Sequence, residues 1–219
     1  MKIFLDTANI AKIKELSQTG LIDGITTNPS LLFKEGGDAK KIILEICSIL
    51  PDGDISVEIT KTNPDDVYKQ AKEIAALSKN IIVKIPCHAD YYKIINKLVI
   101  EEVPVNVTLV FTMLQSLMMA KLGVTYISPF VGRLDDLDVD GNVIISEIRE
   151  MLDNYNFETE LLAASIRTVR EFHEAILNGA DAVTMPVEIF EKSIKHILTN
   201  QGIEKFTEDW KKLGIQQFP

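Results

Sequence analysis

Asn80-Ile-Ile-Val-Lys-Ile-Pro-Cys87 is the stretch that decides the fold, because it combines the pattern of a buried strand with a charged residue. Its run of β-branched residues, bounded by Pro86, is typical of a parallel strand covered on both faces. Lys84 lies inside this run, although lysine is rarely buried because its charge loses solvation. Burial favours a neutral amine, which attacks carbonyl carbons and forms Schiff bases. We expect either a nucleophilic Lys84 or a lysine at the strand end whose ammonium group reaches water.

Seven further apolar runs share this pattern, and helical patterns separate them. The eight runs are residues 2–6, 24–28, 54–59, 80–85, 104–110, 124–130, 160–166 and 181–185. Helix start signals lie between them, such as Asn63 before Pro64, where an N-cap precedes a proline at the first helical position. Eight strand-then-helix repeats in 219 residues predict an α/β fold, a single (β/α)8 TIM barrel. A doubly wound open sheet is the alternative, but it often has a glycine-rich first turn, which the residues after Asp6 lack.

The domain prediction is one TIM-barrel domain over residues 1–219, with the barrel in residues 1–198 and an extra C-terminal helix in the tail, residues 199–219. The tail carries much apolar surface for a terminal segment, in Phe206, Trp210, Leu213 and Phe218. Such a tail either folds over its own barrel or packs on a neighbouring subunit.

Composition excludes several classes of partner. The net charge of −9 opposes an electrostatic grip on nucleic acid, so we expect no nucleic-acid partner. No apolar stretch approaches the length of a membrane span, so we expect no membrane partner. Cys47 and Cys87 are too few for a disulfide scaffold, which favours a reducing, cytoplasmic location.

Polar residues stand at or just after the ends of seven predicted strands, where TIM barrels place their chemistry. They are Asp6, Asn28, Ser30, Glu58, Lys84, Asn106, Thr108, Ser128, Arg133, Ser165 and Arg167. Taken singly, Asp6 has an alternative role as a helix cap and Asn28 as a turn residue. Arg133 has an alternative in an ion pair with Asp135 or Asp136. We favour a shared site, because accidental convergence from seven strands is much less probable than any one structural role.

The catalytic candidates in this set suit a class I aldol reaction. Lys84 is the expected nucleophile, which forms an imine with a ketose. Glu58 and Thr108 are placed to hold a water that carries protons during imine formation and hydrolysis. Asp6 is expected to take the hydroxyl proton when the carbon–carbon bond breaks.

The substrate-binding candidates suit a phosphorylated sugar. Amide and hydroxyl side chains match sugar hydroxyls, and arginine binds phosphate bidentately. The candidates are Asn28, Ser30, Asn106, Ser128, Phe130, Arg133, Ser165 and Arg167. The expected substrates are therefore sugar phosphates.

Four motifs make the chain similar to the transaldolases, and most similar to the small transaldolase group that includes fructose-6-phosphate aldolases. They are Leu5-Asp6-Thr7-Ala8-Asn9, Gly24-Ile-Thr-Thr-Asn-Pro-Ser30, Val83-Lys84-Ile85-Pro86 and Ser128-Pro-Phe-Val-Gly-Arg133. The resemblance runs along the whole chain. It implies a TIM barrel, Schiff-base chemistry on Lys84, Asp6 as the acid/base, and neither a metal nor an organic cofactor.

The resemblance also implies a reaction and an assembly. The reaction is transfer of a dihydroxyacetone unit from sedoheptulose 7-phosphate or fructose 6-phosphate to glyceraldehyde 3-phosphate or erythrose 4-phosphate, in the pentose phosphate pathway. The alternative is a fructose-6-phosphate aldolase that releases free dihydroxyacetone. In those aldolases the position of Glu58 resembles a glutamine and that of Phe130 a tyrosine. Family members of this size form pentamers and decamers in which the C-terminal helix reaches a neighbour, so we expect a homo-oligomer.

One motif points elsewhere. Asp136-Leu-Asp-Val-Asp-Gly141, followed by Glu147, satisfies the EF-hand loop pattern. An EF-hand needs an entering helix, whereas the residues before Asp136 predict a strand, and Ile144 supplies no oxygen at the ninth loop position. We interpret the segment as an acidic loop and expect no metal site. The non-enzymatic alternative is an inactive barrel that serves as an oligomeric scaffold or a calcium-responsive binder.

Overall fold

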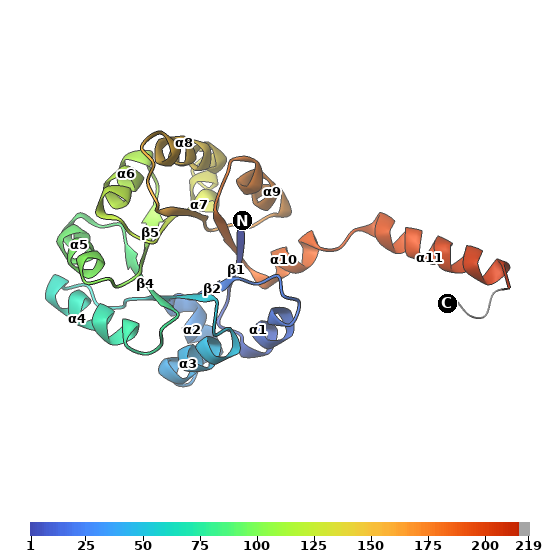
Figure 1. Ribbon diagram of the computed structural model, residues 1–219, viewed down its shortest axis with the longest axis horizontal. Helices are drawn as coiled ribbons and strands as arrows, with labels where there is room; N and C mark the ends of the chain where they lie inside the picture. The colour runs from blue at the N-terminus through green and yellow to red at the C-terminus, as the bar shows by residue number, and fades with distance from the viewer. Residues whose placement is uncertain (215–219) are drawn as a thin grey trace.

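Eight parallel strands form a closed barrel at the centre of the computed structural model (Figure 1), and the structure describes residues 1–214. The strands pair in chain order, and β8 closes on β1. They are β1 Lys2–Asp6, β2 Gly24–Thr26, β3 Asp54–Glu58, β4 Ile81–Pro86, β5 Val105–Val110, β6 Tyr126–Pro129, β7 Glu160–Ala163 and β8 Ala182–Met185. The closed barrel confirms the predicted (β/α)8 fold and excludes the open sheet.

Most of the helices surround the barrel and cover the outer face of the strands, whereas α11 extends away from it (Figure 1). The helices are α1 Ile10–Ser17, α2 Pro29–Glu35, α3 Ala39–Ile49, α4 Pro64–Ala75, the short 3-10 helix Ala89–Tyr91, α5 Tyr92–Ile100, α6 Met113–Leu122, α7 Val131–Asp135, α8 Gly141–Asn154, α9 Val169–Leu177, α10 Val187–Ser193 and α11 Ile197–Lys212. β4 is buried from Ile81 to Ile85 because side chains fill the barrel on one face and helices cover the other. This double covering explains the continuous apolar runs in the sequence.

Two short helices, α2 and α7, begin where the sequence predicted the ends of strands. Asn28 caps α2 by accepting a hydrogen bond from the backbone of Leu31 at 3.0 Å, and Pro29 takes the first helical position. α7 lies close to the loop after β7, since a Cβ added to Gly132 would lie 2.4 Å from the carbonyl oxygen of Ser165. A glycine is therefore required at this contact between the sixth and seventh βα loops.

A polar cluster fills the N-terminal end of the barrel, the end opposite the βα loops. Lys2 donates a hydrogen bond to the Tyr126 hydroxyl at 2.6 Å, which in turn donates to Asp54 at 2.5 Å. Burial of the phenol and its bond to Asp54 raise the pKa of Tyr126 above its usual range, so it stays a donor. Because this cluster occupies the N-terminal end of the barrel, we expect a site at the other end, where the strands have their carboxyl ends.

The C-terminal segment contains two helices, and the second begins two residues before the tail of residues 199–219 in which a helix was predicted. α10 ends at Ser193 and α11 begins at Ile197, because His196 caps the new helix by accepting a hydrogen bond from the backbone of Leu198 at 3.2 Å. α11 extends away from the barrel (Figure 1), and none of its residues is buried. Phe206, for example, is 73% exposed. Phe218, predicted as part of this apolar surface, lies outside the described residues.

None of the helices within residues 1–214 is long and apolar enough to span a bilayer.

Candidate active site

Two adjoining cavities, of about 230 and 420 Å³, open at the carboxyl ends of the strands. Both are lined by Asn28, Lys84, Phe130 and Arg133. The smaller one is also lined by Asp6, Thr26, Ser128, Ala164, Ser165, Arg167 and Thr184, and the larger one by Pro29, Ser30, Leu31, Lys34, Glu58, Thr108 and Leu109. The structure thus gathers every predicted site residue except Asn106 around these two adjoining cavities.

Lys84 lies inside the barrel, and only 5% of its surface is exposed. Its Nζ lies 3.2 Å from a carboxylate oxygen of Glu58 and donates to the backbone carbonyl of Thr27 at 3.3 Å. Glu58 is the register partner of Lys84 on the neighbouring strand, which explains the contact. The amine therefore faces the cavity, and it does not reach out into bulk water as the alternative interpretation required.

Thr108 lies beside this pair, and its hydroxyl has no hydrogen-bond partner within the part of the chain that the structure describes. A buried hydroxyl is normally paired, and a water bound in the polar space next to Lys84 and Glu58 would pair it. β5 is irregular here, with a register shift between Val107 and Val110 and a φ of 56° at Leu109. Strained backbone of this kind concentrates at functional sites.

Asp6 ends β1 and is not used as a helix cap, since Asn9 caps α1. Its Oδ1 accepts a hydrogen bond from the Thr26 hydroxyl at 2.8 Å. Loss of water around the carboxylate raises the pKa of Asp6 above its usual range, against the opposing effects of Lys84, Thr26 and Lys34. A carboxylate with a raised pKa is better suited to accept and return a proton.

Asn106 is fully buried behind the cavity wall. Its Oδ1 accepts a hydrogen bond from Ser128 at 2.6 Å, and its Nδ2 donates to Ser56 at 3.0 Å. Ser128 lines the cavity, whereas the amide of Asn106 is occupied by its two serine neighbours. The structure therefore places Asn106 where it supports Ser128, one layer behind the expected contact with substrate.

Arg133 and Arg167 both line the smaller cavity, but their partners differ from the expected ones. Arg133 stacks over the ring of Phe130, with its guanidinium carbon 5.1 Å from the ring centroid. Arg167 forms a two-bond ion pair with Asp136, with Nη2 2.8 Å from Oδ2. The guanidinium holds the pKa of Asp136 below its usual range. The ion pair with Asp136 was considered for Arg133 and is made by Arg167.

The other predicted residues, Phe130, Ser165 and Ser30, also line the two cavities. Phe130 also packs edge-on against Phe111, at a centroid distance of 6.1 Å. Ser165 has a φ of 60°, which is uncommon for a residue with a side chain and is held by the contact of its carbonyl with Gly132. Ser30 is exposed in the first turn of α2.

Residues 3–217 match the model of the family described as Transaldolase/Fructose-6-phosphate aldolase. The chain belongs to this family. Relatives named "Probable transaldolase" include that of Bartonella henselae, 45% identical over 98% of this chain and 98% of the relative. Those of Desulfosudis oleivorans and Leptospira biflexa are 48% and 47% identical, over 97% and 98% of this chain and 99% and 100% of theirs. The protein is therefore an enzyme of the transaldolase family, and the inactive scaffold is no longer favoured.

A doubly substituted flavocytochrome b2 with sulfite bound has a similar fold, with a TM-score of 0.61 at 13% identity. The match covers 85% of this chain and 56% of the flavocytochrome. At this identity the similarity concerns the barrel alone.

Three polar residues that line the two cavities were missed by the sequence analysis: Thr26, Thr184 and Lys34. Thr26 is the register partner of Asp6 on β2, so the strand ends carried a signal for it. Thr184 is the one hydroxyl residue in β8, but a threonine in a strand is too common to indicate a site by itself. Lys34 lies in the last turn of α2, a helix the sequence analysis did not predict.

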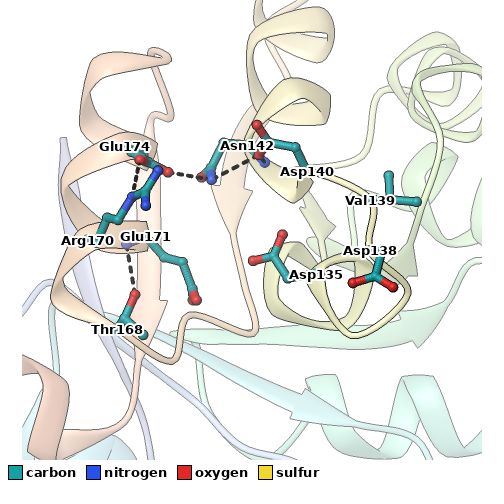
Figure 2. Close-up of a pocket in the computed structure, with 9 residues that line it drawn as sticks. All are labelled: Asp135, Asp138, Val139, Asp140, Asn142, Thr168, Arg170, Glu171 and Glu174. Atoms are coloured by element: carbon teal, nitrogen blue, oxygen red, sulfur yellow. Dashed lines mark hydrogen bonds and ion pairs between the residues drawn. The ribbon is translucent and has the colours of Figure 1, made fainter.

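The EF-hand pattern falls beside a separate acidic cleft of about 400 Å³ between the α7–α8 loop and α9 (Figure 2). Asp140 caps α8, and Asn142 donates to Glu174 at 2.5 Å, which also accepts from Arg170 at 2.7 Å. Asp136, the first residue of the pattern, is paired with Arg167. Among residues 1–214, no group of three or more His, Cys, Asp or Glu side chains is arranged to hold a metal ion.

Proposed function

We propose that this enzyme is a transaldolase that works through a Schiff base on Lys84 and transfers a dihydroxyacetone unit between sugar phosphates. The observation that carries the proposal is the buried amine of Lys84, which lies 3.2 Å from Glu58 at the edge of a cavity. The same cavity is lined by Thr108, whose hydroxyl has no partner among residues 1–214. A buried amine beside a proton-transfer group is the arrangement that imine formation needs. Cys47 and Cys87 are both free thiols, which is consistent with the reducing environment of the cytoplasm.

The reaction begins when the Lys84 amine attacks the ketose carbonyl of sedoheptulose 7-phosphate or fructose 6-phosphate. The carbonyl oxygen leaves as water, and Glu58 and a water held by Thr108 move the protons that this requires. The hydroxyl proton of C4 then passes to Asp6 as the C3–C4 bond breaks. The part of the donor that begins at C4 leaves as an aldose phosphate. The other three carbons stay on Lys84 as an enamine.

The second half of the reaction reverses these steps with a new aldehyde. The enamine carbon attacks the carbonyl of glyceraldehyde 3-phosphate or erythrose 4-phosphate, and Asp6 returns its proton to the new hydroxyl. Water then attacks the imine and frees Lys84. Arg133 and Arg167 suit the terminal phosphate, and Asn28, Ser30, Ser128 and Ser165 suit the sugar hydroxyls.

Transfer is favoured over release because the cavity has a phenylalanine at position 130. Release of free dihydroxyacetone requires protonation of the enamine carbon, and a phenylalanine has no hydroxyl to supply or position that proton. The decisive measurement is cleavage of fructose 6-phosphate with and without erythrose 4-phosphate, because glyceraldehyde 3-phosphate is the other cleavage product and would only regenerate fructose 6-phosphate. Equal rates under both conditions would identify a fructose-6-phosphate aldolase and overturn the transaldolase proposal.

Phe130→Tyr is expected to raise the rate of dihydroxyacetone release several-fold. The variant is conservative, because a tyrosine ring keeps the packing against Phe111 and the platform under Arg133. Released dihydroxyacetone is measured with an enzyme-coupled reduction in the absence of an acceptor. Phe111→Tyr, which alters the neighbouring ring, serves as the matched control. An unchanged release rate in Phe130→Tyr would show that the missing hydroxyl does not control the outcome.

The apolar face of α11 is proposed to pack against another subunit of a homo-oligomer, a pentamer or decamer. Ile203, Phe206 and Trp210 follow the spacing of one helical face. An exposed apolar stripe on a helix that extends from the barrel suits an interface. Removal of residues 197–219 is expected to reduce the mass measured by light scattering to that of a smaller assembly.

A pair of single substitutions separates an interface from a purely local effect. Phe206→Asp places a charge on the apolar face and is expected to dissociate the assembly, whereas Glu208→Lys changes the opposite side of the helix. Retention of the full mass by the truncated protein would mean that α11 takes no part in assembly.

A further inference from the structure

Two buried hydroxyl groups meet beside the carboxylate of Asp6. β1 lies between β2 and β8, and each of these strands contributes one threonine, Thr26 and Thr184. Only 1% of Thr26 and 4% of Thr184 is exposed. Their Oγ1 atoms lie 2.6 Å apart, and Thr26 Oγ1 is also 2.8 Å from Asp6 Oδ1. Both threonines line the cavity that contains Lys84.

The number of hydrogens fixes the direction of this chain. A threonine hydroxyl has one hydrogen, and Thr26 uses it toward Asp6, whose ionised carboxylate can only accept. The hydrogen between the two hydroxyls must therefore come from Thr184. Within residues 1–214, Thr184 Oγ1 has no other hydrogen-bond partner. The chain runs from Thr184 to Thr26 to Asp6.

We propose that Thr184 is a positioning residue for the proton transfer, which directs the Thr26 hydroxyl onto Oδ1 of Asp6 and leaves Oδ2 to the substrate. The proposal rests on the proposed role of Asp6 in bond cleavage. An accepted hydrogen bond polarises the hydroxyl of Thr26 and strengthens the bond that it donates. The carboxylate is thereby held in one orientation, and the proton of the C4 hydroxyl arrives on Oδ2.

The chain also affects the charge state of Asp6. Hydrogen bonds to the carboxylate oppose the effect of burial on its pKa. The charged groups that face Asp6 are Lys84 from β4 and Lys34 from α2, with Arg133 and Arg167 elsewhere on the cavity wall. Loss of the Thr184 hydroxyl leaves all four in place and weakens only the bond from Thr26. The pKa of Asp6 should then rise, so its base form should disappear at a higher pH.

Thr184→Val is the test, because it replaces the hydroxyl by a methyl group of similar size. We expect kcat for transfer to fall about tenfold, the lower end of the range for a charge-assisted hydrogen bond, because Thr184 acts indirectly. KM should change less than about twofold, since Thr184 is 4% exposed and its hydroxyl is directed to Thr26. The acidic limb of the kcat/KM profile should move to higher pH.

Trapping with sodium borohydride and fructose 6-phosphate isolates the affected step. Lys84 should form its adduct in Thr184→Val as fully as in the unmodified enzyme, since imine formation does not use Asp6. Thr159→Val is the matched control. Thr159, directly before β7, is also buried, and its hydroxyl donates to the carbonyl of Val124 at 2.8 Å. It should leave the pH profile unchanged.

The outcomes separate this inference from the proposed function. Absence of an adduct in the unmodified enzyme would refute the Schiff-base proposal itself. A normal adduct with the same kcat and pH profile in Thr184→Val as in Thr159→Val would refute the role of Thr184 alone. If Thr184→Val fails to fold, Thr184→Ser and Thr184→Ala give the answer, since both lose the methyl group and only serine keeps the donor. Near-normal kcat in the serine variant and a tenfold loss in the alanine variant support the inference, and equal values overturn it.

Discussion

Lys84→Arg is expected to reduce transfer activity to background, a loss of more than about a hundredfold, while the barrel remains folded. A guanidinium group stays protonated and cannot form the imine, although it keeps the positive charge. Glu58, which lies 3.2 Å from the lysine amine, would still have a cationic partner. The substitution therefore removes the nucleophile without leaving a buried carboxylate unpaired, which would be strongly destabilising.

Activity is measured together with the melting temperature and with borohydride trapping. The unmodified enzyme should gain the mass of a reduced three-carbon or six-carbon adduct on the peptide that contains Lys84, and Lys84→Arg should gain none. Lys121→Arg, at an exposed lysine in the last turn of α6, is the control and should behave as the unmodified enzyme. Retention of a few per cent of activity by Lys84→Arg would exclude Lys84 as the imine-forming residue.

The barrel could be predicted from the sequence because burial on two faces leaves a simple pattern. A strand such as β4 must be apolar along its whole length, so a lysine inside it stands out. The same reasoning placed Asp6 and Glu58 at strand ends, and the structure brings both to the cavity of Lys84.

What the sequence did not predict depends on contacts between loops. The pair between Arg167 and Asp136 joins residues 31 positions apart. It forms where α7 meets the loop after β7, at a distance that only a glycine at position 132 allows. Helix α2 was missed because its seven residues are too few for a periodic pattern, and with it Lys34 was missed.

Thr184 illustrates a different limit. A threonine in a strand is ordinary, because its β-branched side chain suits a pleated sheet. Its significance comes from closure of the barrel, which brings β8 next to β1 although the two strands lie at opposite ends of the chain. A prediction of eight strands implies this closure but not which side chains then meet.

Arg133→Ala is expected to lower kcat/KM for phosphorylated substrates roughly ten- to a hundredfold, the effect of losing one charge-assisted contact worth about 1.5–3 kcal/mol. Arg133 is the better placed of the two arginines, since within residues 1–214 it forms no ion pair and its guanidinium stacks on Phe130. Unphosphorylated acceptors such as glyceraldehyde should be affected far less. Arg170→Ala, which removes an exposed arginine paired with Glu174, is the matched control and should change neither substrate class.

Asp136→Asn tests the second arginine in the same assay. Arg167 is held by Asp136 in an exposed ion pair, and such pairs contribute only about 0–1 kcal/mol, so a substrate phosphate can displace the carboxylate. Removing the competing charge should lower KM for phosphorylated substrates by up to about fivefold and leave glyceraldehyde unaffected. Arg167→Ala should have the opposite effect on the same substrates. If Arg133→Ala weakens phosphorylated and unphosphorylated acceptors equally, or if Asp136→Asn raises KM, these arginines support the loops and do not bind the phosphate.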